Sequence, residues 1–190
     1  MKKLIILIAI IPTLIFGQTV IEKETFRIMN EYRISNGLKA IPYSSKISKA
    51  AEHQCRYMVL SGVVGHLQEI DLPRFQEIKD PAERFHKIVG NKSIGSWISE
   101  ICTSNPMAVC CPKGITINIG GSNNGSLSKY TMSGDSTIDV PIISIDAFRS
   151  SDGHNRIMLT PDQDGLKAGI SVIYDPIKKR HYTAIVFGKE

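Results

Sequence analysis

Two histidines and a glutamate, far apart along the chain, are the residues whose chemistry points to a site. His154 follows Asp152-Gly153 and precedes an apolar run, so we expect it just after a glycine turn, lining a cleft. His66 lies just beyond a predicted helix, and Glu100 stands in an alternating stretch typical of a strand. Neutral imidazoles are good zinc ligands, and a carboxylate can move a proton or orient an imidazole. These three residues predict a site if the fold brings them together.

Two histidines alone make an incomplete zinc site, because a closed structural site has four protein ligands. His66 and His154 would leave positions open for water, a carboxylate or a ligand, and such a site binds metal weakly and in a pH-dependent way. If Glu100 shares the cleft, it could deprotonate a metal-bound water, which would make the protein a hydrolase. The simpler role, which we favour, is that Glu100 orients an imidazole through a hydrogen bond.

The other polar candidates are predicted to be structural. Ser99 and Ser151 lie near the key residues, but neither stands in the Gly-x-Ser-x-Gly elbow that a serine hydrolase uses. His53 and His86 fall on predicted helices, and His181 begins the last predicted strand. Trp97 is expected to belong to the core.

The chain has four cysteines, and if it is exported, as its N-terminus suggests below, disulfides are plausible. A disulfide between the adjacent Cys110 and Cys111 would be strained, so each is expected to pair with a different cysteine. Cys102 would join one of them across a short loop, and Cys55 would either pair with the other or stay buried as a free thiol.

The N-terminus has the pattern of a secretory signal peptide, with Lys2-Lys3 followed by an apolar run from Leu4 to Phe16. Cleavage is expected after Gly17, and the run is too short for a stable membrane span. Residues 18–190 would then form one domain, secreted or held in the cell envelope or periplasm. Removal of the two lysines lowers the formal net charge from +5 to +3, and such a mild, scattered excess does not indicate nucleic-acid binding.

Helical spacing predicts helices in the first half of the chain. One covers residues 20–36 and stops at Gly37. A second starts at Ser44 or Ser45 and stops at Gly62. Its inner face would carry four residues: Ile47, Ala51, Cys55 and Met58. A third short helix has Asp80 as its cap and Pro81 at its first position, and it ends at Gly90.

The later part of the chain indicates strands. Residues 96–101 alternate, which would send Glu100 and Cys102 to one face of a sheet and Ile101 to the other. Residues 103–140 suggest an elaborated loop that could contain a hairpin, with a strand at 115–119, followed by a helix from Pro141. The chain would end on a hairpin formed by residues 168–174 and 181–187. Helices first and antiparallel strands last predict an α+β fold.

With these residues in place, the sequence resembles the bacterial form of the CAP superfamily, the cysteine-rich secretory, antigen 5 and pathogenesis-related proteins, also called SCP-like extracellular domains. The segments that carry the resemblance are Asn30-Glu31-Tyr32-Arg33 with Asn36-Gly37-Leu38, Ala51 through Met58 leading to His66, Ser99-Glu100-Ile101, Ser151 through Leu159, and the terminal pair of strands. Their order and spacing make the assignment specific. The resemblance implies a three-layer α-β-α sandwich with a central antiparallel sheet.

The resemblance also implies a large cleft with two histidines and two acidic residues, whose histidines can hold a divalent metal, often zinc. His66, Glu100 and His154 match three of these positions. At the fourth, where many relatives have glutamate, this chain has Ser151 with Asp152 nearby. We therefore expect a secreted domain whose cleft weakly binds a divalent metal and an extracellular lipid, glycan or protein, with a metal-assisted hydrolase using Glu100 as the alternative.

Overall fold

The computed structural model describes residues 18–70, 72, 75, 78–90, 98–105, 113–119 and 128–190. The predicted signal peptide, Trp97, Cys110 and Cys111 lie outside these residues. The described elements, in chain order, are α1 (Val20–Ser35), α2 (Ser45–Ser61), α3 (Pro81–Val89), β1 (Ser99–Asn105), β2 (Thr116–Ile119), β3 (Ser128–Thr131), α5 (Ser136–Arg149), α6 (Asp152–Met158), β4 (Leu166–Asp175) and β5 (Arg180–Lys189).

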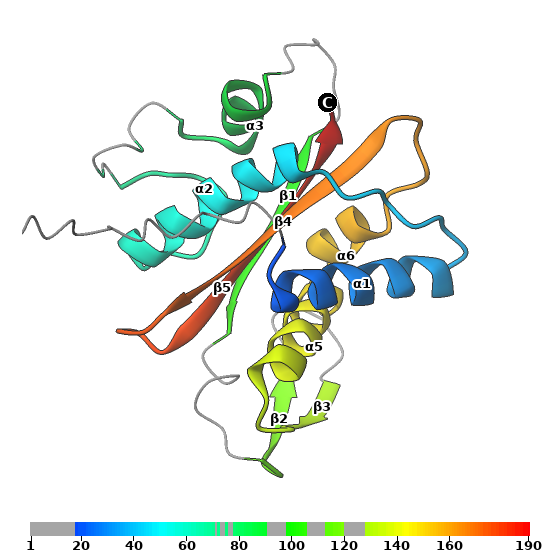
Figure 1. Cartoon of the computed structure of the whole chain (residues 1–190), viewed down its shortest axis with the longest axis vertical. Coiled ribbons are helices and arrows are strands. Elements are labelled where there is room, and N and C mark those ends of the chain that lie inside the picture. The colour runs from blue at the N-terminus through cyan, green and yellow to red at the C-terminus, as the bar shows by residue number, and fades with distance from the viewer. Residues whose placement is uncertain are drawn as a thin grey trace, which may run out of the picture.

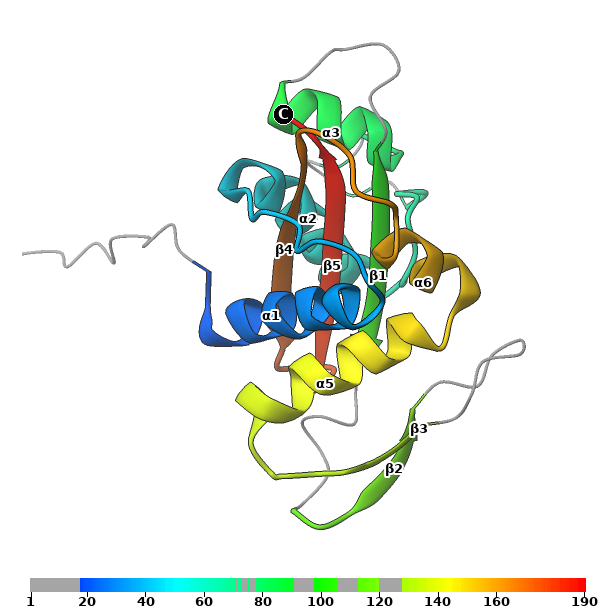
Figure 2. The ribbon, with the colours of Figure 1, turned by 90° about the vertical axis from the view of Figure 1, so that its right-hand side faces the viewer.

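Helices cover both faces of a twisted antiparallel sheet of order β1-β5-β4, with α2 and α3 on one side and α1, α5 and α6 on the other (Figures 1 and 2). Each interface has its own apolar core. The core under α1 and α5 includes Phe26 and Phe148, and the core under α2 and α3 includes Met58 and Phe85. The predicted three-layer α-β-α sandwich is confirmed.

Alternation along β1 distributes its side chains between the two cores. Ile101 packs in the core beneath α1 and α5, whereas Cys102 packs in the core beneath α2 and α3. Glu100 pairs with Val186 of β5, a residue of the second core, and it is buried. The period of two along a strand, with both faces covered, therefore turns Glu100 inward toward α2 and α3.

The predicted ends of α2 and α3 are confirmed by their caps. The Ser44 hydroxyl accepts a hydrogen bond from Ile47 N, and α2 stops at Gly62, whose φ of 76° suits a residue without a Cβ. The Asp80 carboxylate accepts from Glu83 N, and α3 stops at Gly90 in the same left-handed conformation. The cap at Gly62 determines where α2 ends and where the loop that carries His66 begins.

The region predicted as an elaborated loop contains a hairpin, as the sequence suggested. The strand expected at 115–119 is β2, and it pairs antiparallel with β3. The following helix, α5, begins at Ser136 and not at Pro141, because Asp135 caps it through Thr137 N. Pro141 is thus inside the helix.

A buried carboxylate holds the β2–β3 hairpin on α5. Asp139 of α5 accepts hydrogen bonds from the Tyr130 hydroxyl at 2.7 Å and from Ser133 N at 2.9 Å. The hairpin also buries Ile117 and Ile119 against α5. In the described part of the chain, no helix combines the length and the apolar character needed to cross a bilayer.

Candidate functional site

The fold brings the three predicted residues to one place from three separate elements. His66 lies in the loop after α2, Glu100 is the second residue of β1, and His154 lies on α6. The Nδ1 atom of His66 is 3.3 Å from Glu100 Oε1. The rings of His66 and His154 meet edge to face with their centroids 5.7 Å apart. The long-range convergence that the sequence required is therefore present.

Arg84 of α3 is the residue of this cluster that the sequence did not reveal. Its Nη2 atom donates to both oxygens of Glu100, at 2.9 and 2.7 Å, and to the carbonyl oxygen of His66 at 3.2 Å. The side chains of Arg84 and Glu100 are 0% and 1% exposed. A buried charge needs a partner, and this pair supplies one to each residue. Arg84 thus holds both the carboxylate of Glu100 and the backbone of His66.

The loop that carries His66 is tied to α2 along its length. The Gln54 amide donates to Gly65 O, and Ile70 N donates to the Tyr57 hydroxyl at 2.8 Å. These bonds lie on either side of His66, whose side chain is 40% exposed. The imidazole therefore reaches solvent from a backbone that is held in place.

The sequence predicted that His154 follows a glycine turn. In the structure it lies within α6 instead. Ser151 is the N-cap residue, and Gly153 lies in the first turn of the helix. The structure departs from the prediction because α6 is anchored from outside: the Tyr32 hydroxyl donates to Asn155 Oδ1 at 2.9 Å. The His154 ring packs edge to face on Phe148, with centroids 5.4 Å apart.

Tertiary bonds from α1 also hold the end of α6. Arg33 Nη1 donates to Met158 O at 2.6 Å and to Thr160 O at 2.9 Å. The two residues expected to neighbour the cleft, Ser151 and Asp152, form the start of this helix, and Asp152 is exposed there.

Burial disfavours the charged forms of two groups in the site, the His154 imidazole and the Cys102 thiol. The pKa of His154 is lowered, first by burial and then by the neighbouring His66. Burial raises the pKa of the Cys102 thiol to about 12, and the nearby Glu100 carboxylate acts in the same direction. His154 is thus favoured as a neutral imidazole, the form that binds metal, and Cys102 as a neutral thiol.

The predicted bridge from Cys102 to Cys110 or Cys111 is wrong for the structure described here. Cys55 and Cys102 are both free, and both are buried in the core beneath α2 and α3. Cys102 points into that interior because β1 alternates, which leaves its sulfur 3.7 Å from His66 Nδ1. Cys55 is buried as a free thiol, one of its two predicted states.

Two sets of atoms around His66 could hold a metal. On its Nδ1 side, ligand atoms of His66, Glu100 and Cys102 all lie within 4.8 Å of one another. The second set pairs the ring of His66 with that of His154. The centroid spacing of 5.7 Å is compatible in length with an ion about 2.0–2.1 Å from one nitrogen of each ring.

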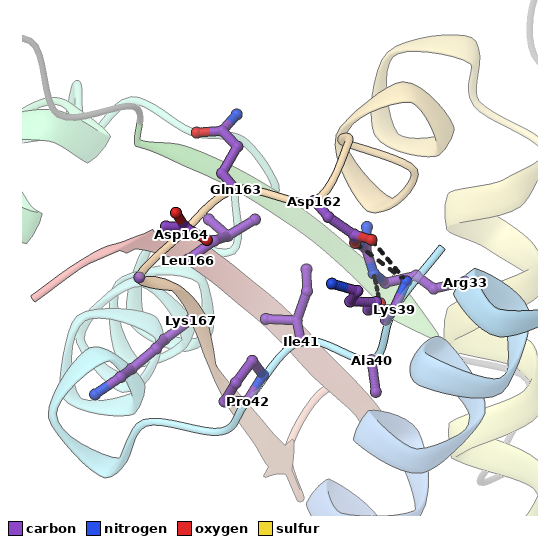
Figure 3. Close-up of a pocket in the computed structure, with 11 residues that line it drawn as sticks. Arg33, Lys39, Ala40, Ile41, Pro42, Asp162, Gln163, Asp164, Leu166 and Lys167 are labelled. Carbon is purple, nitrogen blue, oxygen red and sulfur yellow. Dashed lines mark hydrogen bonds and ion pairs between the residues drawn. The ribbon is translucent and has the colours of Figure 1, made fainter. Parts of the chain in front are cut away.

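A cavity of about 360 Å3 lies elsewhere, between the linker after α1 and the start of β4 (Figure 3). None of the predicted site residues lines it. Arg33 donates to Asp162 and to Lys39 O, and the backbone nitrogen of Lys39 donates to Asp162. These hydrogen bonds join α1 and the linker after it to the segment after α6.

Several solved structures have similar folds. An outer surface protein from Borrelia burgdorferi matches with a TM-score of 0.58 at 15% identity, over 92% of this chain and 96% of that protein. An extracellular protein containing an SCP domain from Bacillus anthracis matches with a TM-score of 0.55 at 13% identity, over 90% of this chain. The chain spans 40% of the length of the Bacillus protein. No family model and no curated protein matches the sequence.

These likenesses establish the architecture, because both extend over nine tenths or more of the chain at low sequence identity. They agree with the three-layer arrangement of helices around an antiparallel sheet. The chain therefore has the SCP fold.

Proposed function

We propose that this protein is an extracellular binding module whose cleft holds a divalent cation, best suited to zinc, between His66 and His154. The observation that carries the proposal is the pairing of the two rings, 5.7 Å apart, next to a buried carboxylate. The predicted signal peptide supports a location outside the cytoplasm. So does the likeness to an extracellular SCP-domain protein and to an outer surface protein.

Glu100 prepares His66 for this role. Its Oε1 faces His66 Nδ1, so the carboxylate favours the tautomer with the proton on Nδ1. That tautomer leaves Nε2 as the lone-pair nitrogen available to a cation. With His154 as the second protein ligand, the remaining coordination positions are open to water and to a ligand from outside.

The inner set of His66, Glu100 and Cys102 is the weaker candidate for the metal. A cation there would lie beside the guanidinium of Arg84, which already binds both Glu100 oxygens. It would also require loss of a proton from Cys102, whose pKa burial raises to about 12. We therefore assign the metal to the two-histidine side.

The contacts of Glu100 favour binding over hydrolysis. A general base must reach the water that it deprotonates. The Glu100 side chain is 1% exposed, and both of its oxygens accept hydrogen bonds from Arg84. Its position supports a role in orienting His66.

Calorimetric titration of zinc into the metal-stripped exported protein tests the proposal. We expect saturable binding in the wild type and its loss in His66→Ala and in His154→Ala. Two controls are expected to bind like the wild type: His86→Ala, which removes a half-buried histidine of α3, and Cys102→Ser, which removes the thiol of the inner set. Zinc binding that survives both histidine variants would overturn the proposal. Loss in Cys102→Ser with retention in His154→Ala would move the metal to the inner set.

A further inference from the structure

Exposed aliphatic side chains gather at the end of α2 and in the loop that follows it. Among the described residues, twelve large apolar side chains are exposed, and five of them fall within residues 60–70. These five are Leu60, Val63, Val64, Leu67 and Ile70. Isolated exposed apolar residues are ordinary, but a group of this kind indicates an interaction surface.

The core does not need these side chains. The inner face of α2 is already supplied by Ile47, Ala51, Cys55 and Met58, which are all buried. The bonds from Gln54 to Gly65 and from Ile70 to Tyr57 fix the returning loop along α2. The aliphatic side chains are therefore presented to solvent from an anchored backbone.

The turn between β4 and β5 adds a sixth apolar residue at the same edge of the molecule. Ile177 in this turn is 90% exposed. The neighbouring Lys178 Nζ donates to Val59 O of α2 at 2.6 Å, and Figure 1 shows the turn beside the end of that helix. We call Leu60, Val63, Val64, Leu67, Ile70 and Ile177 the apolar rim.

Basic residues adjoin the apolar rim. The β4–β5 turn carries Lys178 and Lys179, and half-buried Arg180 follows them at the start of β5; Asp175 is the acid that pairs with Lys178 at 3.4 Å. On α2, Arg56 is 62% exposed and pairs with Glu52, and Glu69 is a further exposed acid in the loop. The turn therefore has an excess of positive charge next to protruding aliphatic side chains.

We propose that the apolar rim and the basic turn dock this protein on an anionic lipid bilayer. Proteins bind such a bilayer when aliphatic side chains enter the boundary between headgroups and acyl chains and basic side chains beside them attract the anionic headgroups. The rim is spread over a helix end, a loop and a turn, and the 360 Å3 cavity lies elsewhere, so the surface suits a broad, yielding partner. His66 belongs to the same loop, so docking would place the candidate site near the lipid surface. The proposal does not rest on metal binding.

Sedimentation of the exported protein with vesicles tests this surface. We expect binding to vesicles of phosphatidylcholine with phosphatidylglycerol, weaker binding to phosphatidylcholine alone, and weakening by salt. Leu60→Glu with Val63→Glu should lower the affinity at least about tenfold. Lys179→Asn should lower it about fivefold, and asparagine tolerates the φ of 50° at this position.

The matched control is Ile34→Glu with Ile138→Glu, on α1 and α5, which adds the same two negative charges at residues 58% and 46% exposed, close to the 63% of Leu60 and the 48% of Val63. It should bind vesicles like the wild type. If the double variant of the rim fails to keep the wild-type melting curve, Ile177→Glu replaces it, because that side chain is 90% exposed. Equal loss in the rim and control variants would overturn the proposal. So would absence of wild-type binding to anionic vesicles, including the case in which the rim instead mediates self-association in sedimentation velocity.

Discussion

Arg84 and Glu100 form an ion pair in the interior of the protein, between α3 and β1. Arg84 Nη2 lies 2.7 Å from Glu100 Oε2 and 2.9 Å from Oε1, and neither side chain is more than 1% exposed. The same nitrogen donates to the carbonyl oxygen of His66. Arg84 thus contributes both to the stability of the core beneath α2 and α3 and to the position of His66, the candidate metal ligand.

Replacement of Arg84 by methionine should therefore destabilise the fold strongly. Glu100 would remain buried without its partner, and we expect the free energy of unfolding in urea to fall by about 3–5 kcal/mol. The double variant Arg84→Met, Glu100→Leu should recover much of this loss, because apolar residues of similar size can replace a buried ion pair at little cost.

The control is Arg56→Met, which breaks an exposed ion pair with Glu52 on α2. Exposed pairs contribute at most about 1 kcal/mol, so this variant should stay close to the wild type. If Arg84→Met is no less stable than Arg56→Met, the buried pair does not have the importance assigned to it.

Stability should fall as the pH is lowered from about 6.5 to about 4, because the pKa of His53 is lowered from 6.5 to about 4 by burial and by the nearby Arg84. In that interval His53 is protonated in the unfolded chain but not in the folded chain. The free energy of unfolding therefore rises with pH. The contribution of His53 is at most about 3 kcal/mol. Burial lowers the pKa of His154 and of His181 as well, which adds in the same direction.

Urea unfolding across this pH interval measures the effect, with His53→Gln as the comparison. The variant lacks the titrating group and should show a shallower dependence. A wild-type stability that is flat or that increases on acidification would contradict the prediction.

The sequence predicted the elements that short-range physics determines. The inner face of α2 follows from helical spacing, and its two ends follow from Ser44 and Gly62. The opposite directions of Ile101 and Cys102 follow from alternation along β1. Each of these features depends on neighbours within a few residues, so a local pattern is sufficient.

Tertiary contacts determined what the sequence did not reveal. Arg84 lies in a short helix with Glu83 and Lys87, where an arginine ordinarily faces solvent, and only the packing of α3 against β1 brings it to Glu100. A helix of seven residues such as α6 has little intrinsic stability and is held by Tyr32 and Arg33 of α1. No pattern near His154 contains those partners.

Cys55 and Cys102 should resist alkylation in the folded protein. Both are buried, and burial raises the pKa of each thiol, to about 12 for Cys102. Because the thiolate is the reactive form, iodoacetamide at mildly alkaline pH should leave both unmodified until urea unfolds the chain. Peptide mass mapping measures the two sites separately. Modification of native Cys102, or its recovery in a disulfide-linked peptide, would contradict this prediction.

Two glycine-to-alanine variants should have opposite effects on stability. A Cβ at Gly169 of β4 would lie 2.1 Å from Ser48 N and 2.4 Å from Ile47 C, which are backbone atoms of α2. Gly169→Ala must separate strand and helix, and we expect a loss of about 1–3 kcal/mol. A Cβ at Gly153 in α6 would meet nothing within 4 Å, and alanine in a helix should raise stability by about 0.5–1 kcal/mol.

Urea unfolding of both variants measures these changes, and Gly153→Ala has a second use. In a glycine turn with positive φ, alanine would be strained and the protein would lose stability. An increase in the free energy of unfolding would support the position of His154 in a helix. A decrease would favour the glycine turn that the sequence predicted.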